Sequence, residues 1–260
     1  MASSTFYYNL KGLQVEDKDN ELKELISSIY YASDCKSGYR IITYKLKRKG
    51  YNVNHKKVQR LMKQLRIRSL LRPKRKNFYK HNQFGRVAPN ILQRVFHADK
   101  PNEKWATDVT QFSLFGKKLY LSPIIDLFNG EIISYEISRH QNYRQITNML
   151  NKAFSKIPDN TKLILHSDQG WQYTLETYQS RLISKGVIQS MSRKGNCLDN
   201  AVIESFFGTL KSELFYYYKF ESIEHLEKAI EKYIDDYNNN RIKLRLKGLS
   251  PVEYRTQFIA

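Results

Sequence analysis

The hydrophobic pattern of this chain changes near residue 101, and that change constrains the fold more than any single motif. Before it, apolar residues recur at the spacing of amphipathic helices. After it, short β-type runs come first, and strands then alternate with helical stretches. Two parts of different architecture are therefore expected, a small helical domain and a larger α/β domain with its own core.

Three strands open the larger part. The run EKWATDVTQFSL, residues 103–114, indicates one strand, and residues 117–138 indicate two more that meet at an Asn129-Gly130 hairpin turn. Helices are then expected at 142–157 and 173–186, alternating with strands at 162–168 and 187–192. This order predicts a ribonuclease H-like core over 101–260, a mixed sheet with flanking helices and a C-terminal helical segment.

The front of the chain predicts an all-α helix-turn-helix domain over 20–68. One helix is expected at 20–31, a second at about 38–49 before Gly50, and a third with Asn54 as its N-cap. Two helices around a glycine-containing turn are typical of modules whose second helix faces DNA. The basic residues of that helix are candidate DNA contacts: His55, Lys56, Lys57, Arg60 and Lys63. An ordinary helical hairpin with a charged outer face fits the same pattern.

The net positive charge lies mostly in the front of the chain. Residues 1–97 hold 22 Lys and Arg but only 6 Asp and Glu, whereas residues 98–260 hold 22 and 19, within a net charge of +19. This asymmetry indicates nucleic-acid binding by the front, although a solvated basic surface has the same composition. An anionic membrane is a poorer partner, because the basic segments lack an apolar face that enters lipid.

Two further segments flank the helical domain, an N-terminal one at 1–19 and a basic linker at 69–100. The linker carries three aromatic residues, Phe78, Tyr79 and Phe84. They could stack on nucleic-acid bases, or else anchor the linker on a neighbouring domain. A short helix is expected at 89–97, before the larger domain.

Several classes of protein are excluded. No apolar stretch reaches the roughly 18 residues of a membrane span, and the first residues lack a signal-peptide layout, so a cytoplasmic, nucleoid-associated protein is expected. Two cysteines are too few for a disulfide framework. The six histidines show no zinc-type pairing, and neither a nucleophile elbow nor a Walker-type phosphate loop is present.

Three carboxylates lie in settings that suit metal binding. Asp108 lies within a β-type run, and Asp168 follows an apolar strand, where sites are commonly built. Glu204 lies on an amphipathic helix that begins near Asp199. Mg²⁺ prefers carboxylate oxygens, and two such ions roughly 4 Å apart can drive in-line phosphoryl transfer. Each acid alone could instead be a solvated or turn-forming residue.

The helix of Glu204 strengthens the hypothesis of a phosphodiester site. Asn200 lies four residues before Glu204 and Lys211 lies seven after it, so the three share one helix face. That face would present an amide, a metal ligand and a cation to a phosphodiester. The opposite, core-facing stripe consists of Ile203, Phe206, Phe207 and Leu210.

These residues lie in stretches that resemble a known family. WATDVTQF, HSDQGWQY, SMSRKGNCLDNAVIESFFGTLKSEL and YNNNRIKLRLKGLSPVEY closely resemble the transposases of bacterial insertion sequences, specifically the second-frame product (OrfB) of the IS-three family. The resemblance implies a retroviral-integrase-type core with an Asp, Asp and Glu triad and 35 residues between the last two acids, as between Asp168 and Glu204. It makes Asp108, Asp168 and Glu204 the ligands of two Mg²⁺ ions, which Mn²⁺ can replace.

The resemblance also implies roles around the triad. Lys211 is expected to contact the DNA end, with Asn200 beside it, and four residues are expected to shape the site: His166, Gln169, Gly170 and Asp199. Many family members carry His at the position of Lys243. The start MASSTFYY resembles an internal stretch of the full transposase, so the product of an upstream overlapping reading frame is an expected partner. Pairing of two DNA ends favours a homo-oligomer.

The expected function is that of a DNA transposase catalytic subunit. It would cut one strand at an element end and join the freed 3′-hydroxyl to another phosphodiester, leading to DNA integration and recombination. Two alternatives stay open at this point. One is a ribonuclease H-like nuclease that hydrolyses without joining, and the other is a non-catalytic DNA-binding regulator.

Overall fold

The computed structural model describes residues 18–70 and 86–259. The chain divides into two compact units, one up to residue 71 and one from residue 72 onward, and each has its own buried core. Nearly all of the predicted N-terminal segment lies outside the described residues, as does the middle of the predicted linker with its three aromatic residues.

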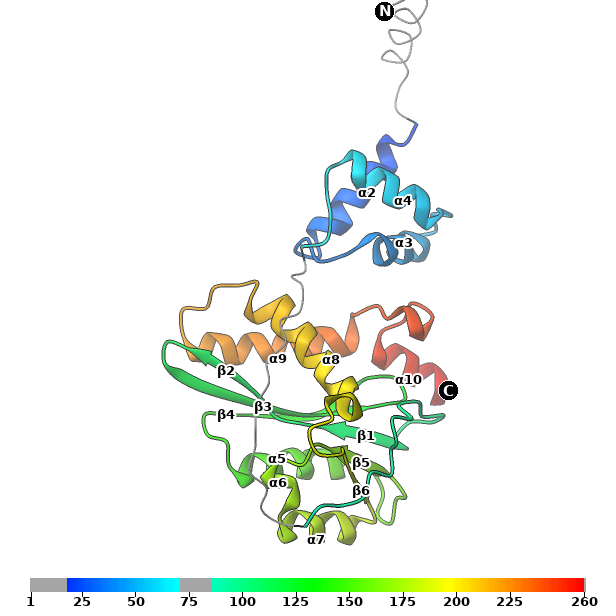
Figure 1. The fold of residues 1–260 in the computed structure, drawn as a ribbon. Helices are drawn as coiled ribbons and strands as arrows, with labels where there is room; N and C mark the ends of the chain where they lie inside the picture. The colour runs from blue at the N-terminus through cyan, green and yellow to red at the C-terminus, as the bar shows by residue number, and fades with distance from the viewer. Residues whose placement is uncertain (1–17, 71–85, 260) are drawn as a thin grey trace, which may run out of the picture. The chain divides into compact units, whose positions relative to one another are not determined.

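The smaller unit consists of α2 (Asn20–Tyr31), α3 (Tyr39–Arg48) and α4 (His55–Gln64) (Figure 1). Gly50 and Asn54 end one helix and begin the next, as predicted. Gly50 has a φ of +89°, a left-handed value that favours glycine and lets the chain leave α3. The Asn54 side chain caps α4 by accepting a hydrogen bond of 2.9 Å from the Lys56 N–H. The three helices share one core, formed chiefly by Ile26, Ile42, Leu46, Val58 and Leu61.

A six-stranded mixed sheet lies at the centre of the larger unit (Figure 1). Its strands are β1 (Lys104–Thr107), β2 (Thr110–Leu114), β3 (Lys117–Asp126), β4 (Ile132–Ser138), β5 (Ile164–Ser167) and β6 (Ile188–Met191). β3 is antiparallel to β1, β2 and β4, whereas β1, β5 and β6 are parallel to one another. β1 and β5 are adjacent and parallel, so their carboxyl ends lie side by side, as the ribonuclease H-like prediction requires.

The strand predicted at 103–114 is interrupted at Asp108 and Val109. β1 and β2 pair with β3 in one continuous register, since Thr107 lies opposite Ile124 and Thr110 opposite Leu121. This register sets Asp108 opposite Pro123. The Leu127 N–H donates to the Lys104 carbonyl, and with the alternation of an antiparallel ladder the next bonds on this edge fall at 125 and 123. Pro123 has no N–H to donate, so the ladder breaks where Asp108 lies.

Helices cover both faces of the sheet. α5 (Tyr143–Phe154) and α7 (Glu176–Lys185) lie on one face, and α8 (Ala201–Leu210) and α9 (Ile223–Asn239) lie on the other (Figure 1). The unit also contains α6 (Trp171–Thr174), α10 (Pro251–Ile259) and a 3₁₀ helix between α9 and α10 (Leu244–Leu246). Successive β1 side chains point to opposite faces: Trp105 packs in the core under α5 and α7, and Ala106 in the core under α8 and α9.

The helix predicted at 89–97 is not present, so that prediction is wrong. Gln93 and Arg94 have φ values of +45° and +65°, which an α-helix cannot contain. The segment instead lies against the edge of the sheet beyond β6. There the Met191 N–H donates to the Pro89 carbonyl, and the Ser190 hydroxyl accepts from the backbone of residues 91 and 92. Hydrogen bonds to the edge strand β6 therefore take the place of the backbone hydrogen bonds of the predicted helix.

The helix that carries Glu204 starts and ends irregularly. A short 3₁₀ helix (Cys197–Asn200) precedes α8, and a π-helical turn (Lys211–Phe215) follows it. The wider turn brings Glu213 into a buried position, where its carboxylate accepts two hydrogen bonds from the Arg241 guanidinium. Across residues 18–70 and 86–259, no helix combines the length and the hydropathy of a membrane span.

Candidate functional site

Asp108 and Asp168 leave the sheet at neighbouring points. β1 is parallel to β5, with Ala106 opposite His166, so the two aspartates follow the same ends of adjacent strands. The Asp108 carboxylate accepts a hydrogen bond of 2.7 Å from the Val109 N–H. The Asp168 carboxylate accepts one of 2.8 Å from the Gly170 N–H. Both side chains are partly exposed, as a site open to substrate requires.

Gly170 lies close to two polar side chains. A Cβ atom there would lie 2.7 Å from the Gln172 amide nitrogen and 2.9 Å from the Asp168 carboxylate. Any larger residue would therefore displace the Asp168 side chain or the Gln172 side chain. The predicted site-shaping role of Gly170 stays a prediction, and this crowding is a physical basis for it.

The third acid, Glu204, reaches the same place from α8. Burial raises the pKa of Asp108 well above its usual range, the negative charge of Asp168 raises it further, and that of Glu204 also contributes. The Val109 N–H and the Lys211 ammonium act in the opposite direction. Three carboxylates from three different elements thus lie within electrostatic range of one another, at the interruption of the first strand.

Such a cluster fits a divalent cation by its charge and its donor atoms. Like charges in a partly buried site destabilise one another unless a proton or a cation compensates them. Within the described ranges, no three His, Cys, Asp or Glu side chains are grouped as ligands of one ion. Mg²⁺ keeps several waters and is commonly held by one or two carboxylates, so the Asp108–Asp168 pair, with Glu204 nearby, meets its requirement.

Lys211 lies beside the triad, just past the end of α8. Its ammonium group lies 5.4 Å from the centre of the Phe112 ring. Burial lowers the pKa of Lys211, and the charge of Asp108 opposes that effect. The side chain is half-buried, so it supplies a positive charge next to Asp108 from within the site. A contact from Lys211 to DNA stays a prediction.

Asp199 holds the loop before α8 in place. Its fully buried carboxylate accepts hydrogen bonds from the side chain and N–H of Arg193, from the Arg94 guanidinium at 2.7 Å, and from the Asn90 amide at 3.1 Å. Arg193, followed by Arg94, holds the pKa of Asp199 far below its usual range. This carboxylate therefore joins the segment around 90–94, the 193–197 loop and the start of α8.

Of the other predicted residues, His166 and Asn200 are buried and Gln169 is half-buried. The His166 ring is buried and its Nδ1 lies 2.8 Å from the Ser190 hydroxyl. Burial lowers the pKa of His166 to about 4, although the Asp199 backbone and charge oppose that effect, so the ring is neutral near pH 7. The Gln169 amide donates to the Ser192 carbonyl. Asn200 is 4% exposed, and its contact with DNA stays a prediction.

The five basic residues predicted to contact DNA from α4 are all exposed. Two of them pair with one acid at the start of α2: the Lys57 ammonium lies 2.6 Å and the Arg60 guanidinium 2.9 Å from the Asp19 carboxylate. His55 packs beside the Tyr39 ring. Lys56 and Lys63 are exposed cations without such a pairing in the described part of the chain, and are therefore the best placed for phosphate.

Sequence reasoning missed Tyr173. This buried tyrosine lies close enough to the site that the charges of Asp108 and Asp168, after burial, raise its pKa well above the usual range. Its ring packs edge-on against Tyr178. The motif HSDQGWQY contains Tyr173, but hydrophobic spacing alone assigns it to the core, where it also belongs.

Comparisons with known proteins agree with this geometry. Residues 98–197 and 204–259 each match a family described as integrase core domain, and residues 17–76 match one described as HTH-like domain. The chain is 53% identical over 254 residues to the proposed transposase InsK of insertion sequence element IS150 from Escherichia coli (strain K12), covering 98% of this chain and 89% of that protein.

More distant relatives extend the comparison. The transposase for insertion sequence element IS904 from Lactococcus lactis is 33% identical over 239 residues, 90% of this chain and 92% of that protein. A chain from the simian T-cell lymphotropic virus intasome, solved with PP2A regulatory subunit B56 gamma, aligns with a TM-score of 0.52 at 15% identity over 88% of this chain and 74% of its own. That likeness concerns the fold.

An integrase core, a ribonuclease H-like sheet and a helix-turn-helix-like domain define a DNA transposase or integrase, a polynucleotidyl transferase that carries DNA-binding modules. The match to the insertion-sequence enzymes is closer still and covers almost the whole chain. The chain belongs to the IS-three family of insertion-sequence transposases, as the sequence motifs predicted.

Proposed function

We propose that this protein is the catalytic subunit that cuts an element end and joins its 3′-hydroxyl to another phosphodiester, in a reaction that requires Mg²⁺. The observation that carries the proposal is the mutual electrostatic effect of Asp108, Asp168 and Glu204, which come from three separate elements. Charge of this density at an accessible edge of a sheet is typical of sites that bind divalent cations.

In the proposed mechanism, a pair of ions held by the triad would activate the attacking oxygen and stabilise the leaving oxygen. The chain's own residues supply position and charge. Adjacent strand ends hold Asp108 and Asp168, and α8 holds Glu204 against them. Lys211 adds a positive charge beside Asp108, where it can stabilise the charge of a phosphodiester. In-line displacement then needs no covalent nucleophile. Mn²⁺ is expected to replace Mg²⁺, because both accept oxygen ligands.

Several partners follow from this proposal. Joining an element end to a target requires that two DNA segments be held together, which favours a homo-oligomer on DNA. The product of an upstream overlapping reading frame is proposed as a further partner, and the nucleoid as the place of action. The helix-turn-helix unit would bind DNA as well.

A strand-transfer assay tests the proposed reaction. We expect the purified protein, given a labelled element end and Mg²⁺, to produce both a cleaved strand and a joined product, and to produce neither when EDTA removes the metal. Denaturing gel electrophoresis separates the two products by length. Cleavage without joining would identify a nuclease, and metal-independent binding with neither product would identify a DNA-binding regulator.

The exposed lysines of α4 predict a salt effect on DNA affinity. Replacing both Lys56 and Lys63 by Ala should lower the slope of log affinity against log salt by about two, because each lost phosphate contact removes roughly 0.9. Fluorescence anisotropy at several salt concentrations measures the slope. Lys232→Ala, an exposed lysine on α9, is the matched control and should leave it unchanged. An unchanged slope in the double variant would instead support an ordinary helical hairpin.

A further inference from the structure

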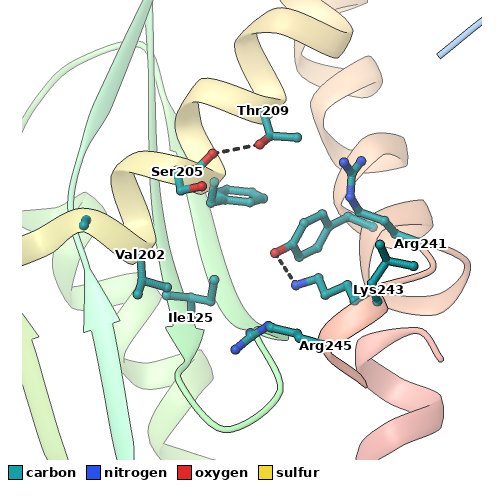
Figure 2. A pocket seen from close by; sticks show the side chains of 11 residues that line it. Ile125, Val202, Ser205, Thr209, Arg241, Lys243 and Arg245 are labelled. Carbon is teal, nitrogen blue, oxygen red and sulfur yellow. Dashed lines mark hydrogen bonds between the residues drawn. The ribbon is translucent and has the colours of Figure 1, made fainter. Parts of the chain in front are cut away.

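A groove of about 460 Å³ lies between α8 and the segment that follows α9. Figure 2 shows its two walls. Val202, Ser205 and Thr209 of α8 form one, and three cationic side chains form the other: Arg241, Lys243 and Arg245. None of the residues that line it is acidic. The role of Lys243 is not explained by the triad, so the groove requires its own account.

Two of the three cations converge on one glycine of the β3–β4 turn. A Cβ atom on Gly130 would lie 2.6 Å from the Lys243 ammonium and 2.6 Å from the Arg245 guanidinium. The two charged groups therefore lie within twice that distance of each other. The Lys243 ammonium donates to the Gly130 carbonyl at 3.0 Å and to the Tyr237 hydroxyl at 2.6 Å, and both acceptors are neutral.

The charge of this pair is not compensated by the described part of the protein. Arg241 has its own partner, because its guanidinium donates two hydrogen bonds to the Glu213 carboxylate. The Arg245 guanidinium, by contrast, makes no hydrogen bond and no ion pair with residues 18–70 or 86–259. Burial, and then the charges of Arg245 and Arg241, lower the pKa of Lys243 to about 6, so near pH 7 this side chain is a full cation only when an anion between the two groups raises that pKa again. Two cations held this close are stabilised by an anion between them.

The position of the groove on α8 suggests which anion. Ser205 adjoins Glu204 in sequence, and Thr209 lies two residues before Lys211, yet at 100° per residue Ser205 and Thr209 point to a different side of the helix from the acidic face. A DNA strand that crosses α8 from the triad would reach the groove within about one helix diameter, 10–12 Å. The Ser205 hydroxyl offers a donor for a phosphate oxygen there, whereas the Thr209 hydroxyl donates to the Ser205 carbonyl at 2.8 Å.

We propose that this groove binds a backbone phosphate of the DNA substrate, with Lys243 and Arg245 as its cationic ligands and the Ser205 hydroxyl as a further donor. This inference rests on the proposed function, since it takes the DNA to be the one processed at the triad. The groove gives the strand a second fixed point across α8 from the reacting phosphodiester. A free phosphate group has the same chemistry, so the experiment must distinguish the two sources.

The test measures DNA affinity in the absence of catalysis. Full-length protein is titrated into a labelled element-end duplex in EDTA at several salt concentrations. We expect Arg245→Gln, and separately Lys243→Gln, to lower the salt slope by about one. Lys247→Gln is the matched control, an exposed lysine two residues from Arg245 that lies outside the groove, and it should leave the slope unchanged. Arg245→Gln removes no hydrogen bond described above, so its folding should match that of the unmodified protein in thermal unfolding.

Neutral methylphosphonate linkages locate the phosphate. Scanning them along the duplex should find a position that weakens binding by the unmodified protein but not by Arg245→Gln. Equal weakening of both proteins at every position, or a loss with Lys247→Gln as large as with Arg245→Gln, would overturn the proposal. The proposal would also be overturned if inorganic phosphate binds the groove while Arg245→Gln leaves the affinity for the duplex unchanged. Failure of strand transfer with the groove effects intact would reject the proposed reaction alone, because binding is measured without metal.

Discussion

Replacing Asp108 by Asn should abolish strand transfer, with a loss of at least about a thousandfold in the rate of joining. The carboxylate is a proposed metal ligand, and a bound cation supplies several kcal/mol of stabilisation to the transition state, at about 1.36 kcal/mol for each tenfold in rate. Asp168→Asn and Glu204→Gln should have effects of the same order, because the three acids are proposed to hold the same two metal ions. Joined product per unit time, measured on a labelled element end, gives the rate.

Stability measurements separate a catalytic role for Asp108 from a structural one. Its pKa is raised in the folded protein, so ionised Asp108 destabilises the fold at neutral pH when metal is absent. Asp108→Asn removes that charge, and its free energy of unfolding in EDTA should equal or exceed that of the unmodified protein. Asp159→Asn is the control, an exposed Asp that pairs with Lys185, and it should retain activity. Joining by the Asp108 variant, or a marked loss of stability, would reject the assignment.

Replacing Asp199 by Asn should destabilise the larger unit by about 2–3 kcal/mol at neutral pH. The substitution removes the fully buried negative charge to which two arginines and a backbone N–H donate. The loss is moderate for a buried ion network, because Arg94 and Arg193 are partly exposed and remain hydrated. Urea unfolding, followed by tryptophan fluorescence, measures the change.

The effect of Asp199 should also depend on pH in a definite direction. The folded protein holds its pKa far below the unfolded value of about 3.9, so the stabilisation is complete above that pH and is lost as pH falls below it. The difference between the unmodified protein and Asp199→Asn should therefore shrink under strongly acid conditions. Asp99→Asn, an exposed residue beside His97, is the matched control. A difference that stays constant below pH 3.9 would contradict the account.

Most of the fold could be predicted from the sequence, because its signals are local. The Asn54 cap, the Asn129-Gly130 turn and the Gly186 helix end each depend on a few neighbouring residues, and all three are confirmed. The triad could be nominated because each acid follows or interrupts an apolar pattern. Its convergence depends on strand order, and the sequence conveyed that only through family motifs.

The features that were missed depend on residues far apart in the chain. The break at Asp108 requires Pro123 on the neighbouring strand, and hydrophobic spacing over 103–114 contains no sign of it. Residues 89–97 have helical spacing, but their backbone is used by the edge of β6. The pairing of Lys57 and Arg60 with Asp19 likewise joins two helices, and the pattern within α4 alone does not show it.

Pro123 affects how firmly the backbone of Asp108 is held in the sheet. With an ordinary amino acid at that position, an amide hydrogen would face the Asp108 carbonyl and could fasten that residue into the sheet as one more rung. Proline lacks that amide hydrogen, so this one hydrogen bond is absent, while the pairing register before and after it is unchanged. The carboxylate can then turn towards its two acidic neighbours without unravelling the centre of the sheet.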